Sequence, residues 1–103
     1  MLEDTEVMMD CPEGYDAPEF TWNVKKCAKQ LKLDDDCLRC TAKEGSGFKT
    51  VMGTERFQEG GKYYFEIFVN KGELLKIGVT RPDYHILHEA FSDTPIGWAI
   101  YNG

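Results

Sequence analysis

The amino-acid sequence predicts an all-β protein, more specifically an antiparallel β-sandwich built from short strands. Glycine-containing turns recur at short intervals along the chain, and the segments between them are rich in aromatic and β-branched residues. Apolar and polar residues alternate in several of these segments, which is typical of strands with one buried face. The chain has 103 residues and no internal repeat, so we expect one domain with a modest core.

The first segment of the chain is acidic. Residues 1–20 hold seven Asp and Glu side chains and no Lys or Arg, although the net charge of the whole chain is only −6. Because blocks of like charge usually stay solvated, we expect a flexible leader over 1–20 and a folded domain over 21–103. The alternative is a docking segment, in which Tyr15, Phe20 and Trp22 pack onto the domain.

The segment 22–33 fits two kinds of secondary structure. Four apolar residues from Val24 to Leu31 fall at i, i+3, i+4 and i+7, which predicts a short amphipathic helix. Alternate residues from Cys27 to Leu33 also fit the two-residue period of a strand. The sandwich is therefore preceded by either a short N-terminal helix or an extended leader.

Turns divide the middle of the chain into short strands. Three consecutive aspartates at 34–36 and the Gly-Ser-Gly sequence at 45–47 predict turns. Alternation over 37–42 predicts a strand between these turns, and a short extended run follows at 48–52.

The segment 63–69 predicts the clearest strand of the chain, because it is aromatic or β-branched almost throughout. Its apolar side chains fall on both faces, which predicts a central strand that is covered on both sides. A turn at 70–72 and a return strand at 74–79 complete a hairpin. A long loop at 81–95 then leads to a last strand that begins at 98–101.

Four short motifs follow one another along the chain: VMG at 51–53, GGKYYFEI at 60–67, LKIGV at 75–79 and GWAIY at 97–101. The second motif is similar to the G-K-x-Y-x-E-V strand signature of SPRY domains, the third to their x-x-I-G-V strand and the fourth to their G-W strand. The first resembles the strand and turn that precede the signature. The resemblance covers 22–103, and it implies a bent, concanavalin-like antiparallel β-sandwich whose loops bind protein partners.

One departure from the family concerns the end of the chain. SPRY domains continue past the G-W strand through several further strands that complete the sandwich, so this chain resembles only the first part of the fold. The chain is expected to be a fragment of a longer protein, to be completed by a second chain, or to pair with itself. In each case we expect exposed apolar surface around Trp98 and Ile100 when the chain is alone.

Two short motifs contain residue types that bind zinc. Cys37 and Cys40 form a C-x-x-C motif, and His85 and His88 form an H-x-x-H motif. The histidines are closer together than is usual for zinc, and cysteines three apart in a strand point to opposite faces. We therefore expect buried or half-buried thiols and no metal or other cofactor. A small zinc- or thiol-dependent protein that uses these four residues is the alternative.

The loop 81–95 is the candidate partner-binding site. It combines residue types that are frequent at interaction hot spots with residue types that titrate. The resemblance to SPRY domains also points to loops between strands. The candidate residues are Arg81, Tyr84, His85, His88 and Phe91. The alternative is a connecting loop in which Tyr84, Leu87 and Phe91 pack inward.

Composition and motifs favour some function classes over others. An acidic chain is a poor match for nucleic acid or for an anionic membrane surface, and no motif positions a nucleophile with a base, so we expect no enzyme. The sequence shows no signal peptide, and its four cysteines are expected to be reduced thiols in the cytoplasm. The chain is therefore predicted to be a non-catalytic SPRY-like interaction module, an adaptor or complex subunit that recognises or holds a protein partner.

Overall fold

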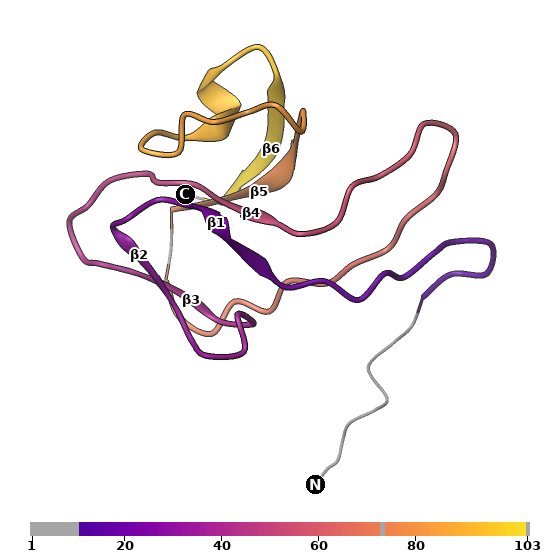
Figure 1. Cartoon of the computed structure of the whole chain (residues 1–103), viewed down its shortest axis with the longest axis horizontal. Coiled ribbons are helices and arrows are strands. Elements are labelled where there is room, and N and C mark those ends of the chain that lie inside the picture. The colour runs from indigo at the N-terminus through magenta and orange to yellow at the C-terminus, as the bar shows by residue number, and fades with distance from the viewer. Residues whose placement is uncertain (1–10, 73, 103) are drawn as a thin grey trace, which may run out of the picture.

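The computed structural model describes residues 11–72 and 74–102 of the chain. Within this part, strands pair two by two into three small antiparallel sheets, β1 with β4, β2 with β3 and β5 with β6 (Figure 1). The elements in chain order are β1 (Trp22–Cys27), β2 (Leu31–Leu33), β3 (Cys40–Ala42), β4 (Val51–Gly53), β5 (Leu75–Thr80), the 3-10 turn η2 (Phe91–Asp93) and β6 (Gly97–Asn102). The predicted all-β class is confirmed.

The ambiguous segment 22–33 forms strands, so the predicted short helix is wrong. β1 pairs with β4 at Trp22 opposite Gly53 and at Cys27 opposite Val51, and its register shifts between these points. β1 therefore bulges, and Val24 in the bulge is 70% exposed. Pairing with a strand distant in sequence satisfies backbone groups that a helix would satisfy locally.

The strand predicted over 37–42 is shorter in the structure. β2 and β3 pair in continuous register from Leu31 opposite Ala42 to Leu33 opposite Cys40. Cys37 instead has a φ of 57° in the turn that joins the two strands. The Asp34 carboxylate holds this turn by accepting the backbone N–H groups of Leu38 and Arg39, both at 2.9 Å.

The prediction of a central strand over 63–69 is wrong. Tyr63 forms one isolated bridge with Asp16. The Asp16 N–H donates to the Lys62 carbonyl, and the Asp16 carbonyl accepts a hydrogen bond from the Tyr64 N–H. Among residues 11–72 and 74–102, no strand ladder extends this bridge along the segment. Phe68 is 84% exposed and therefore lacks the cover expected of a central strand.

Side chains of this segment nevertheless share a face, as alternation requires. The Tyr63 ring stacks on Phe57 at 4.6 Å between ring centroids, and Phe65 lies 5.9 Å from both Phe57 and Phe20. Phe20 in turn contacts Trp22 edge to face. Contacts within this aromatic cluster thus fix the segment, whereas the sequence predicted that strand pairing would do so.

The described part of the acidic leader contacts the domain. Asp16 pairs with the backbone around Tyr63, and the Lys62 ammonium lies 5.8 Å from the centre of the Tyr15 ring. Together with Phe20, these contacts agree with the docking alternative. The flexible-leader prediction stays a prediction for residues 1–10, which lie outside the described residues.

Strands β5 and β6 form the longest regular pairing of the described chain. Six consecutive residue pairs join them without a shift, from Leu75 opposite Asn102 to Thr80 opposite Gly97. The predicted partner of β5 was the segment 63–69, so the strand itself is confirmed and its partner is corrected. We call β5 and β6 together the β5–β6 ribbon.

Gly78 allows the two strands of the ribbon to approach closely. A Cβ atom at this position would lie 1.9 Å from the Trp98 carbonyl oxygen and 2.6 Å from the Ala99 Cα. The structure shows a close approach of two paired strands in continuous register.

The substitution Gly78→Ala tests this close approach. An added methyl must push β6 away, so we expect a loss of about 1–3 kcal/mol in the free energy of unfolding. Ordinarily this substitution would stabilise by restricting the unfolded chain, so the sign is diagnostic. Urea denaturation measures the change, and an unfolding midpoint equal to or above that of the native chain would contradict the observed packing.

Candidate interaction site

Five apolar side chains lie on one face of the β5–β6 ribbon. Directly opposite residues of an antiparallel pair share a face, and the pairs Ile77–Ile100 and Val79–Trp98 therefore lie together, with Leu75 beside them. We call these five side chains the apolar ribbon face. Ile100 is 80% exposed, Trp98 59% and Val79 45%, whereas Leu75 and Ile77 are half-buried. The exposed apolar surface predicted around Trp98 and Ile100 is confirmed.

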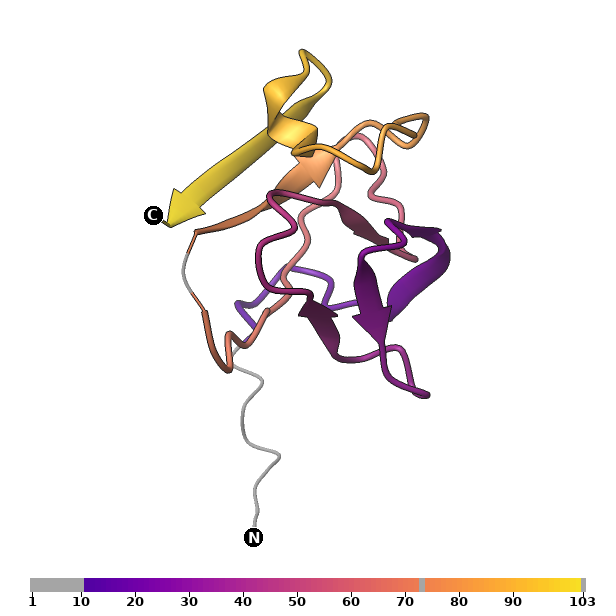
Figure 2. The same cartoon turned by 90° about the vertical axis from the view of Figure 1, so that its left-hand side faces the viewer.

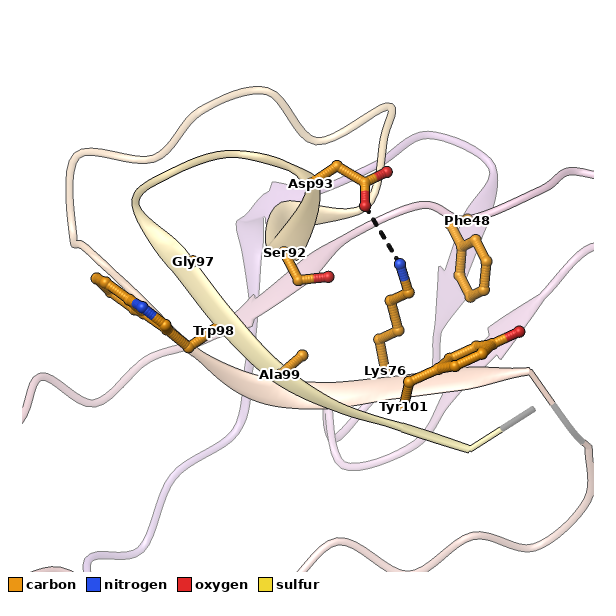
Figure 3. A pocket seen from close by; sticks show the side chains of 8 residues that line it. All are labelled: Phe48, Lys76, Ser92, Asp93, Gly97, Trp98, Ala99 and Tyr101. Carbon is orange, nitrogen blue, oxygen red and sulfur yellow. Dashed lines mark hydrogen bonds and ion pairs between the residues drawn. The ribbon is translucent and has the colours of Figure 1, made fainter.

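The opposite face of the ribbon carries a partly covered lysine. The Lys76 ammonium lies 3.3 Å from the Asp93 carboxylate, 4.6 Å from the centre of the Phe48 ring and 5.4 Å from that of Tyr101. Figure 3 shows Lys76 reaching from β5 toward Asp93, with the two aromatic rings beside it. One ion pair and two cation–π contacts thus fix this side chain.

A cavity of about 620 Å³ lies on the Lys76 side of β6. Its lining combines small residues of β6, Gly97 and Ala99, with the polar side chains of Lys76, Ser92 and Asp93 (Figure 3). We call it the ribbon pocket. An ammonium, a carboxylate and a hydroxyl beside apolar surface are suited to orienting one side chain of a ligand.

Thr50 connects the loop 81–95 to the rest of the molecule. Its N–H donates to the Leu87 carbonyl at 2.9 Å, its hydroxyl donates to the Glu89 carbonyl at 2.6 Å, and its carbonyl accepts the Ala28 N–H at 3.0 Å. Thr50 and Ala28 are both buried. We call this hydrogen-bonded residue the Thr50 junction, because it joins the chain before β4, the turn after β1 and the loop.

The five partner-binding candidates of the loop 81–95 lie in different environments. Tyr84 is only 1% exposed, its hydroxyl donates to the Ile86 carbonyl, and burial raises its pKa. A partner cannot reach this side chain, so Tyr84 is a core residue. Phe91 is half-buried at the start of η2, while Arg81, His85 and His88 are exposed.

Two exposed candidates gather at one turn of the loop. The Arg81 guanidinium lies 3.4 Å from the Asp83 carboxylate, and the His85 ring nitrogen Nδ1 lies 3.3 Å from the Asp83 carbonyl. These contacts are at the surface, where such pairs contribute little stability. A binding role for Arg81, His85, His88 and Phe91 stays a prediction.

Cysteine and histidine residues of the alternative zinc site come from separate parts of the fold. Cys37 lies in the turn before β3, Cys40 within β3, and both histidines lie in the loop 81–95. Among residues 11–72 and 74–102, no three His, Cys, Asp or Glu side chains gather closely enough to hold a metal ion. All four cysteines of the chain are free thiols in the structure.

The protonation of these groups follows from burial and hydrogen bonding. Burial, with a smaller effect of neighbouring Cys27, raises the pKa of Cys40 to about 11. Burial followed by the proximity of Cys37 also raises the pKa of Cys27. In contrast, the backbone N–H groups that Asp34 accepts, Arg39 first, lower the pKa of its carboxyl. Because the thiolate is the nucleophile and metal ligand, the raised values disfavour thiol chemistry at Cys27 and Cys40.

Comparisons of this chain with protein-family models, with curated proteins and with solved structures found no match. Within the described residues, no helix has the length and apolar character needed to cross a membrane.

Sequence reasoning found only part of the site. Trp98 and Ile100 were singled out, and the alternation of β5 could have added Val79 to the same face. Lys76 and Asp93, which shape the ribbon pocket, are distant in sequence, and no motif links the two. Their pairing depends on the position of η2 beside the ribbon, which the sequence did not reveal.

The Thr50 junction predicts a specific stability effect. Thr50→Val keeps the side-chain shape but leaves the Glu89 carbonyl without its hydrogen-bond donor. We therefore expect the free energy of unfolding to fall by about 1–3 kcal/mol. Thr50→Ser is the matched control, because it retains the hydroxyl. Urea denaturation of both variants measures the effect, and equal losses for Val and Ser would show that the hydrogen bond does not hold the loop.

The raised pKa of Cys40 predicts slow alkylation. At pH 8, a pKa of about 11 in place of 9.0 lowers the thiolate fraction by about a hundredfold. We therefore expect Cys40 to react with iodoacetamide much more slowly in the folded chain than in urea, with a rate that still rises above pH 9. Mass spectrometry of the labelled peptide gives both rates. Similar folded and unfolded rates at pH 8 would contradict burial of this thiol.

Proposed function

We propose that this chain is a non-catalytic protein-interaction module, an adaptor or complex subunit that holds a protein partner on its β5–β6 ribbon. The observation that carries the proposal is the apolar ribbon face, where Ile100 and Trp98 are mostly exposed on a regular pair of strands. Contiguous exposed apolar surface of this kind usually marks an interaction site. Tryptophan is also the residue type most often found at interaction hot spots.

The arrangement around the ribbon supports recognition and gives no support to catalysis. Lys76 is engaged by Asp93 and by two aromatic rings, which favours an orienting role over proton transfer. His85 and His88 lie in the loop 81–95, whereas Cys37 lies in the turn before β3 and Cys40 within β3. A protein partner, rather than nucleic acid or a membrane surface, also agrees with the net charge of −6.

The SPRY-like sandwich belongs to the same proposal. The all-β class and the strands at the LKIGV and GWAIY motifs support it. The three separate two-stranded sheets are compatible with an incomplete sandwich, and we propose that a downstream segment of a longer protein or a second chain completes it. Four free thiols support the proposed cytoplasmic location.

Site-specific photo-cross-linking tests the proposed function. A photoreactive amino acid replaces Ile100 in one variant and Val24 in another, because both positions are exposed, apolar and on strands. In the cells that produce the protein, we expect a discrete protein adduct from position 100 and none from position 24. Adding Trp98→Thr to the first variant is expected to reduce the adduct at least tenfold, because the apolar contact is lost.

Two results would contradict the proposal. Equal adducts from positions 100 and 24 would indicate nonspecific apolar contact. Stoichiometric zinc in the purified chain, lost together with the fold in Cys40→Ser, would favour the alternative of a zinc-dependent protein.

A further inference from the structure

A second cavity, of about 310 Å³, lies on the β2–β3 hairpin. Both views place this hairpin away from the β5–β6 ribbon (Figure 1 and Figure 2). The cavity is at the open end of the hairpin, where β2 begins and β3 ends. Its lining residues are Lys29, Gln30, Leu31, Lys32, Thr41, Ala42 and Lys43. We call this cavity the hairpin pocket.

Strand pairing places two lysines of the pocket on one face of the hairpin. Lys32 lies directly opposite Thr41. The pairing extends one step beyond Ala42, because the Lys43 N–H donates to the Gln30 carbonyl at 3.4 Å. Residues two apart in an extended strand share a face, so Lys43 lies on the same face as Thr41. Lys32 and Lys43 are thus diagonal neighbours, and long side chains at such positions can reach one ligand together.

The hairpin pocket concentrates positive charge in an acidic chain, whose net charge is −6. Among the described residues the ion pairs are those of Lys76 and Arg81, so the three exposed lysines of the pocket have no carboxylate partner. The aspartates at 34–36 occupy the turn of the hairpin, at its opposite end. Like charges at neighbouring positions repel one another. The three ammonium groups therefore favour an anion that carries more than one charge.

Gln30 adds an unsatisfied acceptor to the pocket lining. Its side-chain Oε1 is buried and, in the part of the chain that the structure describes, has no hydrogen-bond partner. Buried polar atoms are normally hydrogen-bonded, and leaving one unpaired is unfavourable. A ligand that brings an N–H donor as well as negative charge would satisfy both the glutamine and the lysines.

Most of the lining surface of the hairpin pocket is nevertheless apolar. Lysine stems and the Thr41 methyl are apolar groups that can pack against a ring, while the ammonium groups stay at the rim. A phosphotyrosine in a polypeptide combines the three required features. Its ring is apolar, its phosphate carries about −1.5 to −2 charges at pH 7, and the backbone beside it offers N–H donors.

We propose that the hairpin pocket binds a phosphotyrosine side chain of a protein partner. The phosphate contacts Lys32 and Lys43 as point charges, and a backbone N–H of the partner donates to the Gln30 Oε1. This site goes beyond the proposed function, because it lies away from the ribbon and requires no occupant of the apolar ribbon face. A nucleic acid is a poorer occupant, since the net charge of −6 repels a long polyanion.

Titration of the full chain with phenyl phosphate, followed by NMR, is the first test. We expect the amide signals of residues 29–32 and 41–43 to shift. Inorganic phosphate and phenol each carry one half of the probe, so we expect both to bind at least about tenfold more weakly. Equal affinity for inorganic phosphate, or shifts confined to other residues, would overturn the proposal.

A degenerate peptide library with a fixed central phosphotyrosine is the second test, with the same library carrying tyrosine as the matched control. We expect the immobilised full chain to enrich phosphotyrosine peptides only. Equal enrichment of the tyrosine library or of a phosphoserine library would overturn the assignment. A short single-stranded DNA that binds as tightly as the best peptide would also overturn it, because the site would then be a general phosphate surface.

Variants of the full chain test the individual contacts with the best peptide. We expect Lys32→Gln and Lys43→Gln each to weaken binding about tenfold, because a charge-assisted contact is lost. Lys25→Gln is the matched control, since Lys25 is exposed on β1 and outside the pocket. An equal loss for Lys25→Gln would indicate net charge alone and would overturn the site.

Gln30→Met separates binding from folding. Removing the unpaired acceptor is expected to leave the urea unfolding midpoint unchanged or higher, while peptide binding weakens about threefold or more. Unchanged binding, or a lower midpoint, would overturn the role given to Gln30. Trp98→Thr is expected to leave peptide binding unchanged, so failure of the hairpin pocket and failure of the ribbon function are distinguishable.

Discussion

The arrangement of this molecule depends on the buried hydrogen bonds of Thr50. Through them the chain before β4 is joined to the turn at Ala28 and to the carbonyls of Leu87 and Glu89 in the loop 81–95. Because β5 ends where this loop begins and β6 follows it, fixing the loop also positions the near end of the ribbon. The sequence suggested this loop as a partner-binding element, but in the structure the loop is largely a structural connection, and its own residue Tyr84 is buried.

The balance of buried and exposed surface explains why the ribbon is suited to binding. Few side chains of the described residues are fully buried, and the apolar ones among them are Ala28, Tyr84 and Ala90. In the part of the chain that the structure describes, strands pair only two by two, so no sheet has a central strand. The apolar ribbon face is one consequence of this small buried core. A protein partner that covers this face would bury apolar surface that the chain alone leaves exposed to water.

Local patterns predicted the fold well where a strand pairs in regular register, and poorly where tertiary contacts decide. β5 and β6 were placed within about two residues, because alternation and flanking turns define them. The segment 63–69 has strong strand propensity, yet among the described residues its backbone forms one isolated bridge, with Asp16, and propensity cannot supply a missing partner strand. For the site, the exposure of Trp98 and Ile100 was predicted. The burial of Tyr84 could not be predicted, because the loop 81–95 has no periodic pattern that separates inward-facing from outward-facing residues.

Amide hydrogen exchange of the free chain, followed residue by residue with NMR, tests the central claim most directly. Because β6 pairs with β5 alone among the described residues, hydrogen-exchange protection must alternate along the strand. We expect the amides of Trp98 and Ile100, which face β5, to exchange at least tenfold more slowly than those of Ala99 and Tyr101. Uniform protection of all four amides in a monomer would mean that the edge is already paired, and uniform lack of protection would mean that the ribbon does not form.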